Sequence, residues 1–206
     1  MRITDKINIT NEDCMELLKR TPDNYYDLAI CDPPYGLGKV LQHTFGKENK
    51  LNKHKLKYWD NERPTLDYFE QLFRVSKNQI IWGGNYFPLP PTRCFICWDK
   101  MVFIPSMSRI EQAWTSFDKL PKLIQINNTD ANRIHLTQKP VALYKWLLDK
   151  YAKPNDKILD THLGSGSIAI ACHDYGFELT ACELDREYYD KAIERIKNHV
   201  AQLKMF

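Results

Sequence analysis

The chain has 206 residues, a length that suits one domain, and its 43% hydrophobic content is ample for one core. It shows no apolar signal region and no apolar run long enough to span a membrane, and its six scattered cysteines favour reduced thiols, so we expect a cytoplasmic protein without a membrane partner. The net charge of +3 is too small by itself to indicate nucleic-acid binding.

Predicted strands and helices alternate along the chain. Short apolar or alternating runs predict strands at 7–10, 27–32, 79–84, 94–98, 111–117, from 157 and at 177–185. Amphipathic runs predict helices at 12–20, 65–76 with Thr65 as cap, 140–152 with Pro140 at the first position, before 176 and from 186. This alternation predicts an α/β fold, a Rossmann-like, doubly wound and mostly parallel sheet.

One segment breaks the pattern. Residues 36–63 show no sustained hydrophobic period and are rich in basic side chains. We expect a single domain over 1–206 that carries this segment as a mobile or inserted piece. Elsewhere, Cys94 and Cys97 form a lone C-x-x-C within an apolar strand, and because zinc needs four ligands, core packing is favoured and no metal is predicted.

The stretch CDPPYG ends the predicted strand at 27–32. Proline has a fixed φ and no backbone N–H, so the two prolines cannot continue the strand. An acid, Asp32, and an aromatic ring, Tyr35, are therefore held at the tip of a buried strand. Cys31 just before them is interpreted as a buried thiol, since no activating base lies beside it in the sequence.

A glycine loop, LDTHLGSGS, lies between a predicted strand and a predicted helix. Gly164 and Gly166 permit close approach of the backbone to a ligand, although a lone G-x-G also fits a tight turn. Asp160 ends the strand before the loop, and Glu183 ends the next strand, where an acid typically binds two ribose hydroxyls. A nucleoside is therefore favoured. Because strand tips of such a sheet share one edge, Asp32 is expected near the glycine loop.

Four motifs together, DPPYG, TQKP, LDTHLGSGS and CELDREYY, resemble the permuted (beta-class) S-adenosylmethionine-dependent amino-methyltransferases of DNA. The resemblance covers nearly the whole chain. The acid-proline-proline-tyrosine motif precedes the glycine loop, which is the circularly permuted order of these enzymes. The resemblance implies S-adenosylmethionine as cofactor and DNA as partner, while a homodimer and a restriction endonuclease partner are left open.

The resemblance also implies a role for each matching residue. Asp32 and the Pro33 carbonyl would accept hydrogen bonds from the amine of a flipped-out base, and Tyr35 would stack on that base. Asp13 and Cys14 would contact the cofactor adenine. The full set of cofactor residues expected from the resemblance is Asp13, Cys14, Asp32, Thr137, Lys139, Asp160, His162, Gly164, Ser165, Gly166, Ser167, Glu183 and Leu184.

The sequence departs from the family pattern at two places. The family loop usually opens D-P-F or D-P-C, whereas Thr161 and His162 follow Asp160 in this chain. The region that usually recognises the target is too short between Phe117 and His135 to hold a domain, and His135 itself fits a loop residue or a site residue equally. DNA-backbone contacts are therefore assigned to the basic segment, with a solvated face as the alternative: Lys39, Lys47, Lys50, Lys53, Lys55 and Lys57.

The expected chemistry also follows from the residues. The lone pair of an exocyclic base amine is delocalised into the ring, and two acceptors pulling on its hydrogens would free that lone pair for methyl transfer. A base inside a duplex must first be flipped out, and an aromatic platform offsets its lost stacking. Aspartate at position 32 favours adenine N6 in the family. Cytosine N4, RNA and a non-catalytic cofactor- or DNA-binding subunit are the alternatives.

Overall fold

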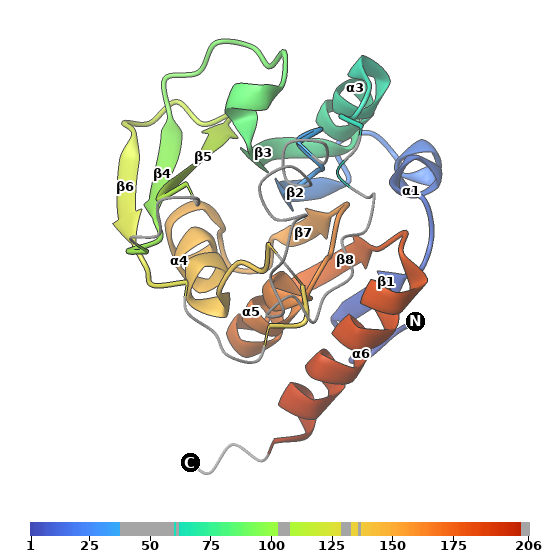
Figure 1. Cartoon of the computed structure of the whole chain (residues 1–206). Helices are drawn as coiled ribbons and strands as arrows, with labels where there is room; N and C mark the ends of the chain where they lie inside the picture. Colours follow the sequence, from blue (N-terminus) through green and yellow to red (C-terminus); the bar gives the residue numbers. More distant parts are fainter. Residues whose placement is uncertain (38–59, 61, 103–107, 129–132, 136, 203–206) are drawn as a thin grey trace.

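The computed structural model describes residues 1–37, 60, 62–102, 108–128, 133–135 and 137–202. Within them the backbone forms an eight-stranded sheet in the order β1-β8-β7-β2-β3-β5-β4-β6 (Figure 1). The strands are β1 Ile7–Thr10, β2 Tyr26–Cys31, β3 Ser76–Trp82, β4 Phe95–Asp99, β5 Ile110–Thr115, β6 Lys122–Gln125, β7 Lys157–Asp160 and β8 Glu178–Cys182. All neighbours pair in parallel except β5, which runs antiparallel to β3 and β4. The predicted α/β, mostly parallel sheet is confirmed.

Helices cover both faces of the sheet. The helices are α1 Cys14–Arg20, α3 Leu66–Val75, the 3-10 turn η2 Gly84–Tyr86, α4 Val141–Tyr151, α5 Ser167–Tyr175 and α6 Arg186–Ala201. On β2, Leu28 and Ile30 join the core cluster of α4, α5 and α6, whereas Ala29 and Cys31 join that of α1 and α3. A strand that is buried on both faces needs apolar side chains at successive positions, which explains the run LAIC at residues 28–31 of β2.

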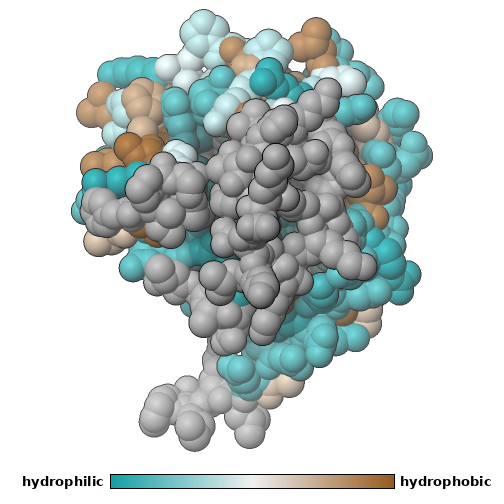
Figure 2. Space-filling view, in the orientation of Figure 1, coloured by the Kyte–Doolittle hydropathy of each residue, from teal (hydrophilic) through white to brown (hydrophobic). Residues whose placement is uncertain are grey.

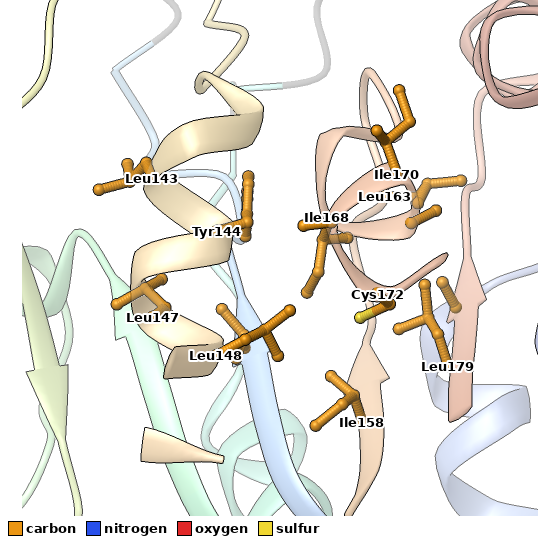
Figure 3. Packing of buried hydrophobic residues seen from close by; sticks show 14 of the residues in the cluster. Leu143, Tyr144, Leu147, Leu148, Ile158, Leu163, Ile168, Ile170, Cys172 and Leu179 are labelled. Atoms are coloured by element: carbon orange, nitrogen blue, oxygen red, sulfur yellow. The ribbon is translucent and has the colours of Figure 1, made fainter. Parts of the chain in front are cut away.

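The core beneath α4 and α5 holds the centre of the sheet in place. Figure 3 shows Leu148 of α4, Ile168 of α5 and Ile158 of β7 gathered in one packed group. All three side chains are at most 1% exposed. Burying an aliphatic side chain of this size contributes about 1.5–3 kcal/mol. This packing fixes where the carboxyl ends of β7 and β2 lie.

Some predicted boundaries and caps are corrected by the structure. Thr65 occupies the N-cap position of α3, but its side chain makes no capping hydrogen bond. Pro140 is the N-cap of α4, and the helix begins one residue later, at Val141. The sequence does not predict the short edge strand β6, Lys122–Gln125. Its four residues, KLIQ, show no alternation of apolar and polar side chains, and in the structure only Ile124 is buried.

The β6 edge of the sheet carries exposed apolar side chains. Leu123 on β6 is 66% exposed and Leu120 just before it is 64% exposed. Figure 2 shows hydrophobic residues at the upper left, where Figure 1 places β4, β5 and β6. Across the described ranges, no helix combines the length and apolar character that crossing a membrane requires.

Candidate active site

The candidate site lies where the strand order reverses. The chain leaves β2 through α3 towards β3 on one side, and leaves β7 through α5 towards β8 on the other. Ligands of open α/β sheets bind at such a switch point, outside the carboxyl ends of the strands. Asp32 follows β2 and Asp160 ends β7, so the two carboxylates lie on adjacent strands at this point.

Buried carboxylates are concentrated at this edge. Asp160 is 2% exposed and accepts a hydrogen bond at 2.9 Å from the backbone N–H of His162. Burial raises the pKa of Asp160 to about 8, and the negative charges of Asp32 and Glu183 also act to raise it. Asp160 therefore holds a proton at neutral pH, and a cation placed beside it would favour the ionised form.

A chain of buried charges leads to Asp32. Lys139 donates a hydrogen bond from Nζ to Asp32 Oδ2 and also lies 3.1 Å from Glu111 Oε2, an ion-pair contact without hydrogen-bond geometry. Glu111 Oε1 lies 2.6 Å from Nζ of Lys100. The chain thus alternates in sign from Asp32 through Lys139 and Glu111 to Lys100. Such alternation stabilises charges that are largely removed from water: the side chains of Lys139 and Lys100 are 2% and 10% exposed, and those of Asp32 and Glu111 are 19% and 20% exposed.

The protonation states of Lys139 and Glu111 follow from their contacts. The Lys139 side chain is 2% exposed, and burial opposes its charge, but the carboxylates of Asp32 and Glu111 outweigh that cost and raise its pKa. Burial likewise opposes the charge of Glu111, yet the two lysines lower its pKa overall. Lys139 is therefore cationic and Glu111 anionic at neutral pH. Nζ of Lys139 also lies 5.1 Å from the ring centre of Trp82.

Tyr35 is fixed against Asp32 at the tip of β2. Its hydroxyl donates to Asp32 Oδ1 at 2.6 Å, and burial raises the pKa of the phenol well above its ordinary value, so the hydroxyl stays a donor. Its ring stacks on Tyr86 with centres 5.0 Å apart and planes 19° apart. Gly83 makes this possible: it has φ +70°, and a Cβ there would lie 2.2 Å from Cε1 of the Tyr35 ring. A side chain at 83 would displace the ring.

The glycine loop is bound to the end of β8. Gly164, with φ +53°, donates its N–H to Glu183 Oε2 at 2.9 Å, and Asp185 N–H donates to Oε1 at 2.9 Å. Burial raises the pKa of Glu183 above its ordinary value. Gly166, with φ +76°, starts α5 so close to α6 that a Cβ would lie 2.8 Å from Cδ1 of Ile196. Each Glu183 oxygen keeps a second lone pair for a ligand.

The serines of this loop are engaged within the protein. Ser165 Oγ and Ser167 Oγ lie 3.2 Å apart, and Arg195 donates to Ser165 O at 2.8 Å and to Ser167 Oγ at 3.0 Å. The sequence does not predict Arg195 on α6, because nothing near it distinguishes it from other helix-surface arginines. Leu184 is 68% exposed next to Glu183.

The remaining predicted cofactor residues lie around the same edge. Asp13 caps α1 by accepting from Met15 N–H at 2.7 Å, and its charge acts on His162, whose pKa burial lowers to about 4. His162 is therefore neutral. Burial raises the pKa of Cys14 to about 12, so this thiol is not ionised at neutral pH. Its role beside Asp13 remains a prediction.

His135, two residues before the TQKP segment, lies beside the glycine loop. Thr137 Oγ1 lies 3.1 Å from Nδ1 of His135, whose ring packs on Tyr188 with centres 4.3 Å apart. A Cβ built on Gly164 would lie 4.0 Å from Cδ2 of His135. His135 therefore lies next to the glycine loop, and a role for it in the site stays a prediction. The neighbouring Lys139 instead points to Asp32, so its predicted contact with the methionine end of the cofactor remains a prediction.

Sequence motifs do not cover every charged residue near the site. Glu111, Lys100 and Asp60 belong to the site region, but lone charged residues carry no motif that would predict them. Among the described residues, no group of three or more His, Cys, Asp or Glu side chains is placed to hold a metal ion. The expected DNA contacts lie outside the described residues: Lys39, Lys47, Lys50, Lys53, Lys55 and Lys57.

Comparisons with known proteins find similarity to DNA methylases. Residues 105–194 match the model of the N6/N4 DNA methylase family, described as "DNA methylase". Type II methyltransferase M.HinfI of Haemophilus influenzae is 24% identical over 95% of this chain and 70% of its own length. M1.MboII of Moraxella bovis is 26% identical over 87% of this chain and 92% of its own length.

Solved structures show the same fold. The M1.HpyAVI–SAM complex superposes with a TM-score of 0.60 at 21% identity, covering 91% of this chain and 98% of that one. The cytosine-N4-specific PvuII DNA methyltransferase gives a TM-score of 0.60 at 15% identity, covering 93% and 91%. The switch point, the acid-proline-proline-tyrosine turn and the glycine loop together form the candidate active site of this fold. The family model and these relatives make the chain similar to the N6/N4 DNA methylases.

Proposed function

We propose that this protein transfers a methyl group from S-adenosylmethionine to the exocyclic N6 amine of adenine in DNA. The observation that carries the proposal is the placement of Asp32 and Tyr35 beside Asp160 and the glycine loop at one switch point. A base-binding carboxylate and a nucleoside-binding loop are thereby held on adjacent strands. M.HinfI and M1.MboII, named as methyltransferases, support the same reaction class.

The residues of the glycine loop suit S-adenosylmethionine. The absent side chain at Gly164 leaves backbone open beside Glu183, whose free lone pairs can accept from ribose hydroxyls. Asp160 offers a buried carboxyl that a cationic ligand would ionise. When bound, S-adenosylmethionine supplies an electrophilic methyl group on a sulfonium. The expected roles of the remaining cofactor residues are part of this proposal.

The protein's own contribution is to prepare the amine. Asp32 and the carbonyl of Pro33 accept hydrogen bonds from the two amine hydrogens, which draws the nitrogen towards tetrahedral geometry and frees its lone pair. The nitrogen releases one of these two protons to solvent once it carries the methyl group, and the sulfonium that gives up the methyl becomes a neutral thioether. Each Asp32 oxygen already accepts one hydrogen bond, from Tyr35 or Lys139, so the amine must use a remaining lone pair. Preorganised acceptors of this kind lower barriers by on the order of 3–4 kcal/mol.

Adenine is favoured over cytosine by the aspartate at position 32, a preference that follows from the family resemblance of the DPPYG motif. Cytosine N4 is the second candidate, because the family includes both kinds of enzyme and the PvuII methyltransferase, whose fold is shared, is cytosine-N4-specific. Both bases present an exocyclic amine to the same acceptors. The difference between them lies in the shape of the pocket that receives the base.

The test is transfer of a labelled methyl group. Wild-type protein is incubated with S-adenosylmethionine labelled in the methyl group and with unmethylated genomic DNA, or with total RNA. We expect label in DNA and none with the Asp32→Ala variant, which should still bind cofactor. Label in RNA alone would contradict DNA as substrate. Cofactor binding without transfer to either polymer would indicate a non-catalytic subunit.

A further inference from the structure

Asp60 is a buried carboxylate outside every motif of the sequence. Its residue is 5% exposed, and burial raises its pKa above the ordinary value. Oδ1 accepts from the backbone N–H of Tyr35 at 2.5 Å and of Gly36 at 2.9 Å, and Oδ2 accepts from Leu37 N–H at 3.1 Å. One side chain thus binds three consecutive amides that directly follow the two prolines.

These amides have no regular secondary structure to bind to. Pro33 and Pro34 carry no N–H, and the backbone beyond them turns through Gly36, which has φ +73°. Successive N–H groups around a left-handed residue form a concave nest that binds an anion. In many proteins such a nest binds a ligand, but in this chain one of its own carboxylates fills it. The nest is therefore structural.

A second contact from the same part of the chain holds the turn from the other side. Arg63 Nε donates to the carbonyl of Tyr35 at 3.0 Å. The backbone N–H and C=O of Tyr35 are thus both bound, by Asp60 and Arg63 respectively. The ring of Tyr35 is confined by Gly83 and stacked on Tyr86, and its hydroxyl meets Asp32. The backbone hydrogen bonds and the ring contacts together hold both the backbone and the side chain of Tyr35 in one position.

We infer that Asp60 is a positioning residue that sets the catalytic turn: by binding the amides of residues 35–37, it fixes the Tyr35 ring and, through the Tyr35 hydroxyl, the carboxylate of Asp32. This inference rests on the proposed function for its kinetic consequence, but not for the anchor itself. Asp60 contacts no reacting atom. Displacement of a positioned group by about 1 Å can cost roughly 100-fold in rate.

The experiment compares Asp60→Ala and Asp60→Asn with wild type. Asp60→Ala removes the acceptor for all three amides, whereas Asp60→Asn keeps one carbonyl oxygen in the same shape. The control is Asp67→Ala, which removes an exposed carboxylate from the first turn of α3. Folding is checked by circular dichroism. Cofactor affinity is measured by calorimetry and should not change, because the glycine loop follows β7, whereas the hydrogen bonds of Asp60 go to residues 35–37.

The first readout is amide hydrogen exchange of residues 35–37. We expect exchange at least about tenfold faster in Asp60→Ala, an intermediate rate in Asp60→Asn and no change in Asp67→Ala, since free amides exchange once their bond is lost. Unchanged exchange in a folded Asp60→Ala variant would overturn the anchor. This readout needs no activity, so it stands even if the wild type methylates nothing.

The second readout is methyl transfer. We expect kcat to fall about 100-fold in Asp60→Ala while the KM for S-adenosylmethionine stays within about twofold, with partial recovery in Asp60→Asn. Faster exchange of the three amides with kcat unchanged would overturn the positioning role and leave Asp60 a structural residue. A wild type without any transfer would refute the proposed function instead, which the exchange result separates from the anchor.

Discussion

Lys139 and Asp32 form a buried ion pair that joins the turn before α4 to the end of β2. The two side chains are 2% and 19% exposed. Glu111 partly neutralises the lysine from the other side, so the lysine can orient Asp32 without placing an unbalanced positive charge beside it. We expect Lys139 to set the direction in which Asp32 presents its free lone pairs to the base amine.

Removing Lys139 should therefore impair chemistry. Lys139→Met takes away a charged hydrogen bond worth about 1.5–3 kcal/mol, so we expect roughly 10- to 150-fold lower kcat. The control is Lys145→Met on α4, because Lys145 forms its ion pair with Asp174 of α5 and not with Asp32. Equal kinetics in the two variants would exclude Lys139 from the site.

The Tyr35 series separates the ring from the hydroxyl. Tyr35→Ala removes the platform, and because stacking on a base is worth about 1–3 kcal/mol, activity should be lost. Tyr35→Phe keeps the ring but not the hydrogen bond to Asp32, so its activity should lie between those of alanine and wild type. Tyr175→Ala, at the exposed end of α5, should change nothing. Full activity of Tyr35→Ala would rule out the platform.

Cofactor affinity should depend on pH through Asp160. Its pKa of about 8 means that the free protein holds a proton there at pH 7, while a cationic ligand favours the carboxylate. Binding should then release a proton, and affinity should rise by up to about tenfold per pH unit towards pH 8 and level off above it. Calorimetry in buffers of different ionisation enthalpy measures this release. Asp160→Asn should abolish it, and an unchanged slope in that variant would assign the proton to another group such as Glu183.

The sequence predicts the sheet and places the DPPYG turn and the glycine loop at one edge of it. It does not predict the charged residues that hold the DPPYG turn in position. Asp32, Tyr35 and Gly164 are predicted at one edge because strand tips of a parallel sheet converge, and they do lie there. Glu111 and Asp60 could not be predicted. A single acid in a strand or loop carries no spacing signal, and its partners come from segments far away in the sequence.

DNA affinity is assigned to the basic segment. Replacing Lys50, Lys53, Lys55 and Lys57 with alanine should weaken binding to all DNA sequences and flatten its salt dependence, since phosphate contacts release counterions. Cofactor affinity should not change. The control replaces four exposed lysines elsewhere on the surface: Lys19, Lys150, Lys153 and Lys197. A wild-type salt slope in the first variant would place the DNA contact on another surface.

The identity of the methylated nucleoside tests the proposed adenine-N6 transfer most directly. Unmethylated DNA is incubated with the protein and S-adenosylmethionine, digested to nucleosides and separated by liquid chromatography with mass detection, with Asp32→Ala run in parallel. We expect N6-methyldeoxyadenosine in the wild-type digest and none with the variant. N4-methyldeoxycytidine in its place would contradict adenine as the target, and either product at wild-type level from Asp32→Ala would contradict the role of Asp32.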